Sequence, residues 1–216
     1  MMVLATVTEK LESLQKPSFG GPLLVVLSGP SGVGKDSTLN KMKAMDRPWH
    51  FVVTVTTRPK RDQELDGEDY IFLELSQFEA MRDQGDLLES AQVYGHWYGV
   101  PKQQVRNALR RREDVILKLD VQGAASVKKI VPAAVFIFLG PPTLQDLKGR
   151  LKGRNTESDS SIDLRVQAAQ REMEYIPIFD YHVVSHYGRL DDVVACVDAI
   201  MTAEKCRIPP REVYCD

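Results

Sequence analysis

An apolar run that passes directly into a glycine-rich loop constrains this chain more than any other part of its sequence. The run Val25–Leu27 leads through Ser28 into a loop that reads Gly-Pro-Ser-Gly-Val-Gly-Lys and ends at Lys35. Glycines adopt positive φ angles and lack a Cβ, so backbone N–H groups and the N-terminus of a following helix can face an anion. Lys35 adds a mobile positive charge for the outer phosphates. The run therefore predicts a strand, a polyphosphate-binding loop and a helix, whereas the alternative is a plain glycine-rich turn.

The residue after Lys35 departs from the usual pattern G-x-x-x-x-G-K-[ST], in which the final hydroxyl holds Mg²⁺. Here that place is taken by Asp36, and Ser37 and Thr38 follow. The change leaves the phosphate cradle intact and affects only the metal contact. We expect Mg²⁺ to be held by Asp36 or Ser37, because both supply the oxygen ligands that this ion prefers.

Composition indicates a single α/β domain with one sizeable core, since the chain has 216 residues of which 43% are hydrophobic. Its 28 basic and 30 acidic side chains give a net charge of −2. This balance argues against a nucleic-acid polymer or an anionic membrane as a partner. Clusters of arginine must therefore be judged locally.

The cysteines and the N-terminal segment indicate a cytoplasmic location. The three cysteines lie near the C-terminus without C-x-x-C spacing, which favours neither a disulfide framework nor a zinc site. Residues 1–20 carry too many charges for the core of a signal peptide and are too short to span a bilayer.

Apolar runs alternate with segments of helical pattern, which is typical of a doubly wound parallel sheet covered by helices on both faces. The predicted strands are Leu23–Leu27, Phe51–Val55, Val115–Leu119, Val135–Leu139 and Tyr181–Val184. The predicted helices are Lys35–Met45, Ser76–Asp83 with a Ser76/Glu79 capping box, Pro101–Arg112 with proline in its first turn, and Asp191–Lys205.

Two polar segments interrupt this core, and they predict a substrate module and a lid. Within residues 54–100, short apolar pieces at Tyr70–Leu73 and Leu87–Val93 predict small antiparallel strands around one helix, as in an inserted substrate module. The run Gly149–Ser161 is too polar and too rich in Ser and Gly to pack, so it predicts a mobile lid over residues 150–165, or else a solvated loop. The core is then 20–53, 101–149 and 166–206, and residues 207–216 form an extended tail.

Three arginines belong to the proposed lid and its flanking helix. Arg150 and Arg154 lie in the polar run, and Arg165 lies off the apolar stripe of the helix that follows. Phosphoryl transfer builds negative charge on the moving group and requires water to be excluded, so arginines on a closing element suit it. The alternative for each is a solvated charged face.

A second basic cluster follows the second predicted strand. Arg58 and Arg61 are three residues apart, and Tyr70 and Tyr98 come later in the same module. Two guanidiniums with phenolic donors make a bidentate clamp for a second, smaller phosphate, which implies a monophosphate acceptor. A basic turn of this kind can also be surface decoration.

Two carboxylates are expected to read a base. Glu89 and Asp120 each end an apolar run, and ligands of open α/β sheets bind at the carboxyl ends of strands. The N1–H and N2–H₂ edge of guanine offers donors to two carboxylates, whereas adenine leaves one charge unpaired. Asp120 could instead hold a metal, and Glu89 could be an ordinary surface carboxylate.

Taken with these clusters, the sequence resembles the guanylate kinase family from about Leu23 to about Ile200. The motifs that carry the resemblance are Gly29–Lys35, Thr56–Arg61, Asp66–Tyr70, Tyr98–Val100, Asp120–Gly123 and Arg150–Arg154. The resemblance implies a P-loop kinase that transfers the γ-phosphoryl group of ATP to GMP or dGMP with Mg²⁺.

The resemblance also implies a role for each site residue. The residues expected to bind ATP are Gly29, Pro30, Ser31, Gly32, Val33, Gly34, Lys35 and Asp36. Those expected to act in catalysis are Lys35, Arg58, Arg150, Arg154 and Arg165, and those expected to bind GMP are Thr54, Arg58, Arg61, Tyr70, Glu89, Tyr98 and Asp120.

Three departures from the family and two alternative functions stay in view. Besides Asp36, Val100 has no hydroxyl where some members bond guanine O6, and Lys118 replaces an acidic residue frequent two positions before Asp120. The chain could be a catalytically silent binding scaffold, although such domains typically lose the arginines kept here. It could also be a P-loop kinase for another phosphorylated acceptor, which would not need two carboxylates at a base edge. Either a monomer or a homodimer fits.

Overall fold

The computed structural model describes residues 20–93, 95–152 and 159–213. Arg154, most of the N-terminal segment, and the centre of the predicted lid lie outside the described residues. Among the residues described, no helix is both long enough and apolar enough to cross a bilayer.

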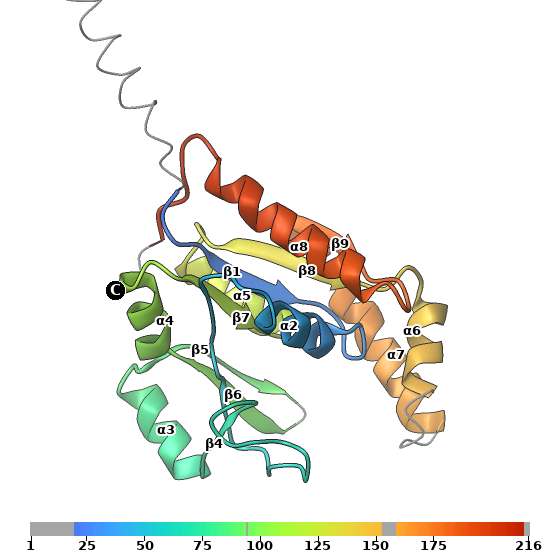
Figure 1. The fold of residues 1–216 in the computed structure, drawn as a ribbon. Helices are drawn as coiled ribbons and strands as arrows, with labels where there is room; N and C mark the ends of the chain where they lie inside the picture. The colour runs from blue at the N-terminus through green and yellow to red at the C-terminus, as the bar shows by residue number, and fades with distance from the viewer. Residues whose placement is uncertain (1–19, 94, 153–158, 214–216) are drawn as a thin grey trace, which may run out of the picture.

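A five-stranded parallel sheet forms the centre of the molecule, which confirms the predicted fold class (Figure 1). Its strands lie in the order β2-β7-β1-β8-β9, and the central strand β1 pairs with β7 on one side and β8 on the other. The strand bounds are β1 (Leu24–Ser28), β2 (Trp49–Phe51), β7 (Asp114–Lys118), β8 (Val135–Gly140) and β9 (Tyr181–Val184).

Helices cover both faces of this sheet, which explains why its strands read as continuous apolar runs. Leu23, Val25 and Leu27 face one core cluster with α2 (Lys35–Lys43) and α8 (Leu190–Lys205). Leu24 and Val26 face the opposite cluster, which includes α4 (Lys102–Arg110) and α5 (Val121–Ile130). The sheet therefore buries alternate side chains of β1 on opposite faces.

A second sheet builds the predicted substrate module, which lies below the central sheet in Figure 1. Its order is β4-β3-β6-β5, and α3 packs on it. The Phe78 ring lies fully buried and stacks on Trp97 with ring centroids 5.8 Å apart. The bounds are β3 (Val55–Thr56), β4 (Ile71–Phe72), α3 (Leu75–Asp83), β5 (Leu87–Val93) and β6 (His96–Pro101).

The predicted strand Phe51–Val55 is wrong, because its two ends belong to different sheets. β2 stops at Phe51 and β3 starts at Val55. Between them, the Gln104 side chain accepts from Val53 N and donates to Val53 O, each at 3.0 Å, so an amide of α4 takes the place of a neighbouring strand. β4 is also parallel to β3, although the sequence predicted antiparallel strands here.

Two helix starts differ from the prediction. Helix α3 has its capping box at Glu74 and Gln77, where each side chain bonds the other residue's backbone N–H, and not at Ser76 and Glu79. Pro101 is the N-cap of α4 and the last residue of β6, so it precedes the first turn.

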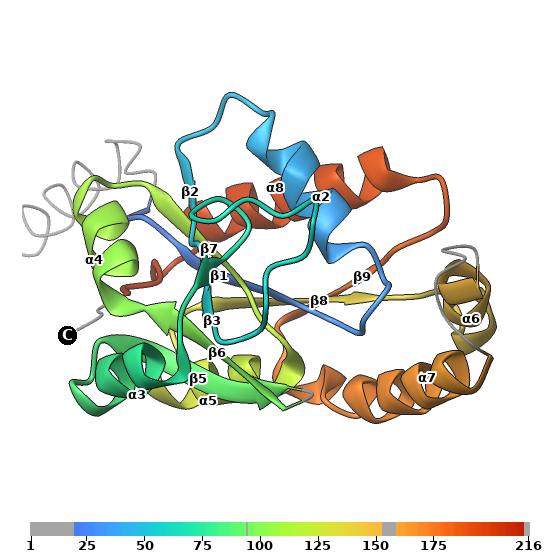
Figure 2. The ribbon, with the colours of Figure 1, turned by 90° about the horizontal axis from the view of Figure 1, so that it is seen from below.

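The polar run expected to be a loop is largely helical where it is described. Helix α6 (Leu144–Lys152) and helix α7 (Asp159–Met173) lie side by side, and the short 3₁₀ helix η1 (Ile176–Ile178) follows (Figures 1 and 2). Their contact is apolar and includes the buried residues Leu147, Leu151, Ile162 and Ala169. The prediction that this run is too polar to pack is therefore wrong at Leu151.

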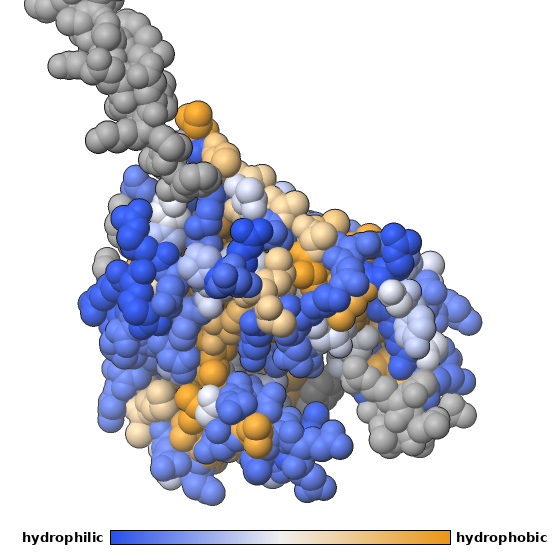
Figure 3. Space-filling view, in the orientation of Figure 1, coloured by the Kyte–Doolittle hydropathy of each residue, from blue (hydrophilic) through white to orange (hydrophobic). Residues whose placement is uncertain are grey.

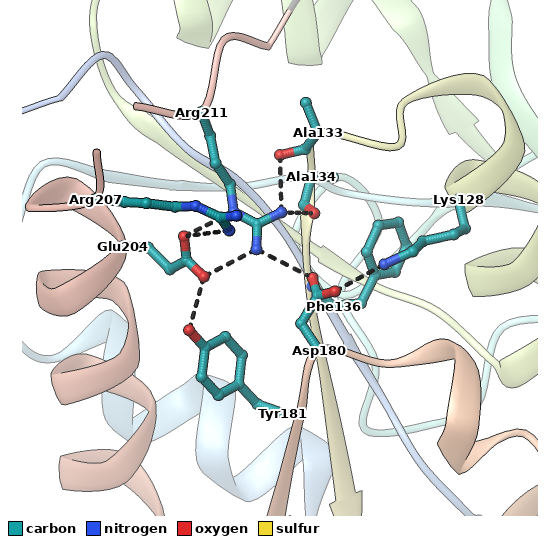
Figure 4. Close-up of polar contacts among 9 residues, drawn as sticks. All are labelled: Lys128, Ala133, Ala134, Phe136, Asp180, Tyr181, Glu204, Arg207 and Arg211. Atoms are coloured by element: carbon teal, nitrogen blue, oxygen red, sulfur yellow. Dashed lines mark hydrogen bonds and ion pairs between the residues drawn. The ribbon is translucent and has the colours of Figure 1, made fainter. Parts of the chain in front are cut away.

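The segment after α8 is docked on the core through Arg211 (Figure 4). The Arg211 guanidinium donates to Glu204 Oε2 and Oε1 at 2.7 and 2.9 Å and to Ala134 O at 3.0 Å. Tyr181 Oη donates to the same Glu204 carboxylate at 2.7 Å, and Arg211 pairs with Asp180 at 3.4 Å. These contacts join the tail to the end of α8 and to the starts of β8 and β9.

Candidate active site

The glycine-rich loop connects β1 to α2 and has the backbone that the sequence predicts. Gly29, Gly32 and Gly34 have φ angles of 141°, 85° and 110°. At Gly29 a Cβ would lie 2.1 Å from Leu139 O, so the loop can approach β8 only without a side chain there. Helix α2 then begins at Lys35, and its first-turn N–H groups point toward the loop.

Lys35 lies against the loop that it follows. Its Nζ donates to Gly29 O at 2.5 Å and to Pro30 O at 3.1 Å. Burial lowers the pKa of Lys35, and the carboxylate of Glu172 opposes this shift. The lysine is thus a desolvated cation beside the anion-binding loop.

Glu172, near the end of α7, was not singled out from the sequence. Burial raises its pKa, while Lys35 and a hydrogen bond from the Ser31 backbone lower it. Within the described part of the chain, its buried Oε2 has no hydrogen-bond partner. Glu172 therefore places a buried carboxyl group on the lysine side of the loop.

The two described lid arginines both reach the loop. Arg150 Nη1 donates to Val33 O at 3.1 Å, and its Nη2 donates to Ser185 O. Arg165 Nη2 donates to Ser31 Oγ at 2.7 Å, in agreement with its predicted place off the apolar stripe. The helical hairpin is thereby attached to the phosphate-binding loop by two guanidiniums.

The residues of the predicted phosphate clamp lie together, around an acidic residue that the sequence analysis missed. Arg58 Nη2 donates to Glu64 Oε1 at 2.7 Å, and Arg61 N donates to Glu64 Oε2 at 2.9 Å. The Arg58 guanidinium lies 5.4 Å from the centre of the Tyr70 ring, and the Tyr70 and Tyr98 rings are 5.9 Å apart. Arg58 and Glu64 line the same cavity, so Glu64 is the present partner of a guanidinium that an anion could otherwise bind.

The two carboxylates expected to read a base come together at the N-terminus of α5. Asp120 is the N-cap of that helix, and its Oδ1 accepts from Gln122 N and Gly123 N at 2.8 Å. Glu89 is the third residue of β5 and does not end its strand, contrary to the expectation from the sequence.

Glu89 is buried in an unusual electrostatic setting. A Cβ at Gly123 would lie 2.8 Å from Glu89 Oε1, so α5 meets the carboxylate at close range. Burial and the nearby Asp120 raise the pKa of Glu89 to about 8. Among the described residues, Glu89 Oε1 has no hydrogen-bond partner, and a ligand with N–H donors would supply one.

Three cavities border the loop and the first turn of α2, and two of them share several lining residues. Figure 3 shows a hollow in the surface between the module and helices α6 and α7. The clamp cavity, about 240 Å³, is lined by Thr54, Arg58, Arg61, Tyr70 and Tyr98. The junction cavity, about 260 Å³, is lined by Ser31, Lys35, Thr54, Arg61, Tyr70, Glu89, Tyr98 and Asp120. The outer cavity, about 700 Å³, is lined by Gly32, Gly34, Ser37, Arg150, Ser185 and Tyr187.

Most predicted site residues line these cavities, but the two candidate metal ligands, Asp36 and Ser37, line different ones. Asp36 lines the clamp and junction cavities, whereas Ser37 lines the outer cavity. Lys118 Nζ pairs with Asp36 Oδ1 at 2.8 Å, a contact that the sequence did not indicate. Ser185 and Tyr187 were missed as well, and their place directly after β9 was the signal that could have found them.

The first turn of α2 fits Mg²⁺ carried by a nucleotide better than it fits a protein-held metal. No group of three or more His, Cys, Asp or Glu side chains in the described ranges could hold an ion. Mg²⁺ needs only one or two protein oxygens when substrate phosphates and waters complete its shell. Asp36, whose side chain is 77% exposed, could supply one such oxygen, Oδ2, beside the Oδ1 that pairs with Lys118.

The parallel sheet, the glycine-rich loop and the arginines that touch it define a P-loop phosphotransferase. Its cavities provide one site for a polyphosphate donor and one for a phosphorylated acceptor. The guanylate kinase family model matches residues 22–204. The chain belongs to the guanylate kinase family.

Individual relatives agree with this assignment. The chain is 42% identical to a guanylate kinase of Halalkalibacterium halodurans over 86% of its own length and 90% of that protein. It is 41% identical to guanylate kinase 2, chloroplastic/mitochondrial, of Oryza sativa, over 89% and 68% of the two chains. The crystal structure of guanylate kinase from Anaplasma phagocytophilum superposes with a TM-score of 0.73 at 26% identity and covers 87% of this chain and 88% of that one.

Proposed function

We propose a division of roles among the site residues for the reaction that family membership assigns to this chain, the ATP-dependent phosphorylation of GMP. The observation that carries the proposal is the junction cavity, which joins Lys35 and Ser31 of the loop to Glu89, Asp120 and the clamp tyrosines. Donor and acceptor phosphates bound at its two ends would meet inside it. Positioning of this kind supplies most of the catalysis in phosphoryl transfer.

On the donor side, the loop N–H groups and Lys35 bind the outer phosphates of ATP. Arg150 and Arg165 stabilise the charge of the phosphoryl group in transit, and both already touch the loop. Arg154, which lies outside the described residues, is proposed for the same task from the sequence alone. The outer cavity beside Ser185 and Tyr187 receives the nucleoside of ATP.

On the acceptor side, Arg58, Arg61, Tyr70 and Tyr98 bind the phosphate of GMP. Arg58 must exchange Glu64 for that phosphate, which is a stronger partner because it carries more charge. Glu89 and Asp120 accept from the N1–H and N2–H₂ groups of guanine, and Thr54 lines the same cavity. These contacts would not distinguish GMP from dGMP, so both are proposed substrates.

Nucleotide kinases generally use Mg²⁺ with ATP, and we assign its protein contact to Asp36. When bound, Mg²⁺ would neutralise charge on the phosphates. Ser37 is a weaker candidate because it lines a different cavity. A cytoplasmic location and the choice between monomer and homodimer stay predictions from the sequence.

A coupled assay of ADP release with ATP and Mg²⁺ tests the acceptor. We expect rapid turnover with GMP and dGMP, and at least about 100-fold lower kcat/KM with AMP or UMP, since a buried carboxylate would be left unpaired. GMP binding without turnover would favour the scaffold, and equal rates with all acceptors would contradict the guanine-reading role.

A further inference from the structure

Lys118 is a cation that neither the sequence analysis nor the division of roles above places in the reaction. It is the last residue of β7, at the carboxyl end of the sheet. Its Nζ lies 2.8 Å from Asp36 Oδ1 and 4.7 Å from the centre of the Tyr70 ring. It therefore joins the first turn of α2 to the tyrosine face of the clamp.

Lys118 borders both the acceptor end and the donor end of the proposed reaction path. It lines the clamp cavity with Arg58 and Arg61 and also lines the junction cavity with Lys35. In the clamp, Arg58 already has a carboxylate partner in Glu64 at 2.7 Å. Lys118 adds a second cation at the same ring, because the Arg58 guanidinium and Lys118 Nζ lie 5.4 and 4.7 Å from the centre of Tyr70.

The pair with Asp36 does not explain the presence of the lysine. Only 23% of the Lys118 side chain is exposed, against 77% for Asp36, so water already solvates the carboxylate. A pair with one exposed partner contributes little to stability, whereas the lysine loses hydration by being held in the cleft. A partly buried cation that lines both the clamp cavity and the junction cavity is more useful to a ligand than to the fold.

We propose that Lys118 is a further substrate-binding residue, which donates a hydrogen bond to the 5′-phosphate of the acceptor, while Asp36 holds its ammonium group at the junction of the two cavities. The proposal rests on the proposed function, since it takes GMP as the acceptor. On this proposal, Lys118, which replaces an acidic residue frequent in the family, adds a contact to the phosphate of the acceptor.

Calorimetric binding of GMP, guanosine and ATP to Lys118→Met and to the unaltered protein tests this proposal without turnover. We expect Lys118→Met to bind GMP at least about tenfold more weakly, the usual effect of losing a charge-assisted hydrogen bond. Guanosine, which lacks the phosphate, should bind both proteins equally, and ATP affinity should change by less than about threefold. Lys129→Met is the matched control, because Lys129 is exposed on α5 and lines none of the three cavities.

The double variant Lys118→Met/Asp36→Asn separates a direct contact from simple charge neutralisation. If Lys118 contacts the phosphate, removing the Asp36 carboxylate leaves GMP binding weak. If Lys118 only cancels Asp36, the double variant regains the affinity of the unaltered protein, and the proposal is overturned. The double variant also gives a second measurement should Lys118→Met alone fail to fold, because it removes the charges at positions 36 and 118 together.

Two further results would overturn the proposal. One is unchanged GMP affinity in Lys118→Met, and the other is an equal loss of guanosine binding. Failure of the proposed function would look different, because the unaltered protein itself would then bind GMP no better than AMP.

Discussion

Glu89 lies in the middle of a strand, against the start of a helix, with its pKa raised to about 8. At neutral pH the free protein therefore holds it mainly in the protonated form. Guanine needs a carboxylate that accepts, so binding of GMP must release this proton. We expect GMP affinity to rise with pH between about 7 and 8, by up to about tenfold per pH unit, and to level off above the pKa.

Calorimetry in buffers of different ionisation enthalpy measures this proton release, and Glu89→Gln is the control. The glutamine should bind GMP weakly with no pH dependence over the same range, where the phosphate of GMP is already ionised. KM for GMP should rise far more than KM for ATP. A flat pH profile in the unaltered protein would contradict the raised pKa.

The raised pKa of Glu89 also makes the stability of the folded protein change with pH in a predictable direction. Its pKa rises from 4.5 in the unfolded chain to about 8 in the folded protein, so folding favours the protonated form. The contribution of protonated Glu89 to the free energy of unfolding is fully present below pH 4.5 and is lost as the pH rises through about 8. In urea unfolding between pH 5 and about 9, Glu89→Gln should remove this loss, so its stability relative to the unaltered protein grows with pH.

Lys35 contributes one ammonium group to the binding of the donor phosphates. Lys35→Ala should lower kcat by about 100- to 1,000-fold, because a preorganised charge at the transferred phosphoryl group is lost. GMP affinity should be retained, since the clamp lies on other elements. Steady-state kinetics and GMP titration together check this, and normal turnover with lost GMP binding would reverse the assignment.

At the scale of elements, the approach of α5 to β5 depends on one glycine. A Cβ at Gly123 would lie 2.8 Å from Glu89 Oε1 and 3.1 Å from Glu89 Cδ. Because Asp120 fixes the start of α5 by two hydrogen bonds, the Glu89 carboxyl must move when the methyl is added. Gly123→Ala should therefore raise KM for GMP about tenfold or more and leave KM for ATP nearly unchanged.

Gly149→Ala is a suitable comparison for that variant, because Gly149 lies within helix α6 and no atom of the described residues lies within 4 Å of the place its Cβ would take. There the added methyl should leave KM for GMP unchanged. Equal effects of the two substitutions on GMP would show that Gly123 has no special contact with the base site.

At the scale of the whole molecule, Arg211 fastens the C-terminal segment to the sheet (Figure 4). Its partner Glu204 has a side chain only 3% exposed, so Arg211→Met leaves a buried carboxylate with Tyr181 at 2.7 Å and the half-exposed Arg207 at 3.8 Å as its partners. Urea unfolding should show a loss of about 3 kcal/mol. Arg111→Met, which breaks an exposed pair with Glu113, should lower the stability far less.

The loss caused by Arg211→Met should depend on pH with a predictable sign. Hydrogen bonds from Arg211 lower the pKa of Glu204 below its ordinary 4.5. Their contribution is complete above pH 4.5 and disappears as the pH falls through the lowered value. The gap between the two proteins should therefore narrow in acid, and a constant gap would mean that packing rather than charge is responsible.

What the sequence determined by itself was local and chemical. The loop from Gly29 to Lys35, strand β9 and the two arginines that touch the loop were predictable, because each depends on residue types at fixed spacing along the chain. The family motifs extended that prediction to the acceptor and to the clamp.

Only the tertiary structure decided which distant residues meet. It divided the predicted strand at Phe51 because a side chain of α4 bonds Val53, and it placed Glu64 against Arg58. It paired Lys118 with Asp36 across 82 positions and set Glu89 against α5. These features depend on burial and on the distances between elements, so no local pattern encodes them, and they set the charge states with which the site works.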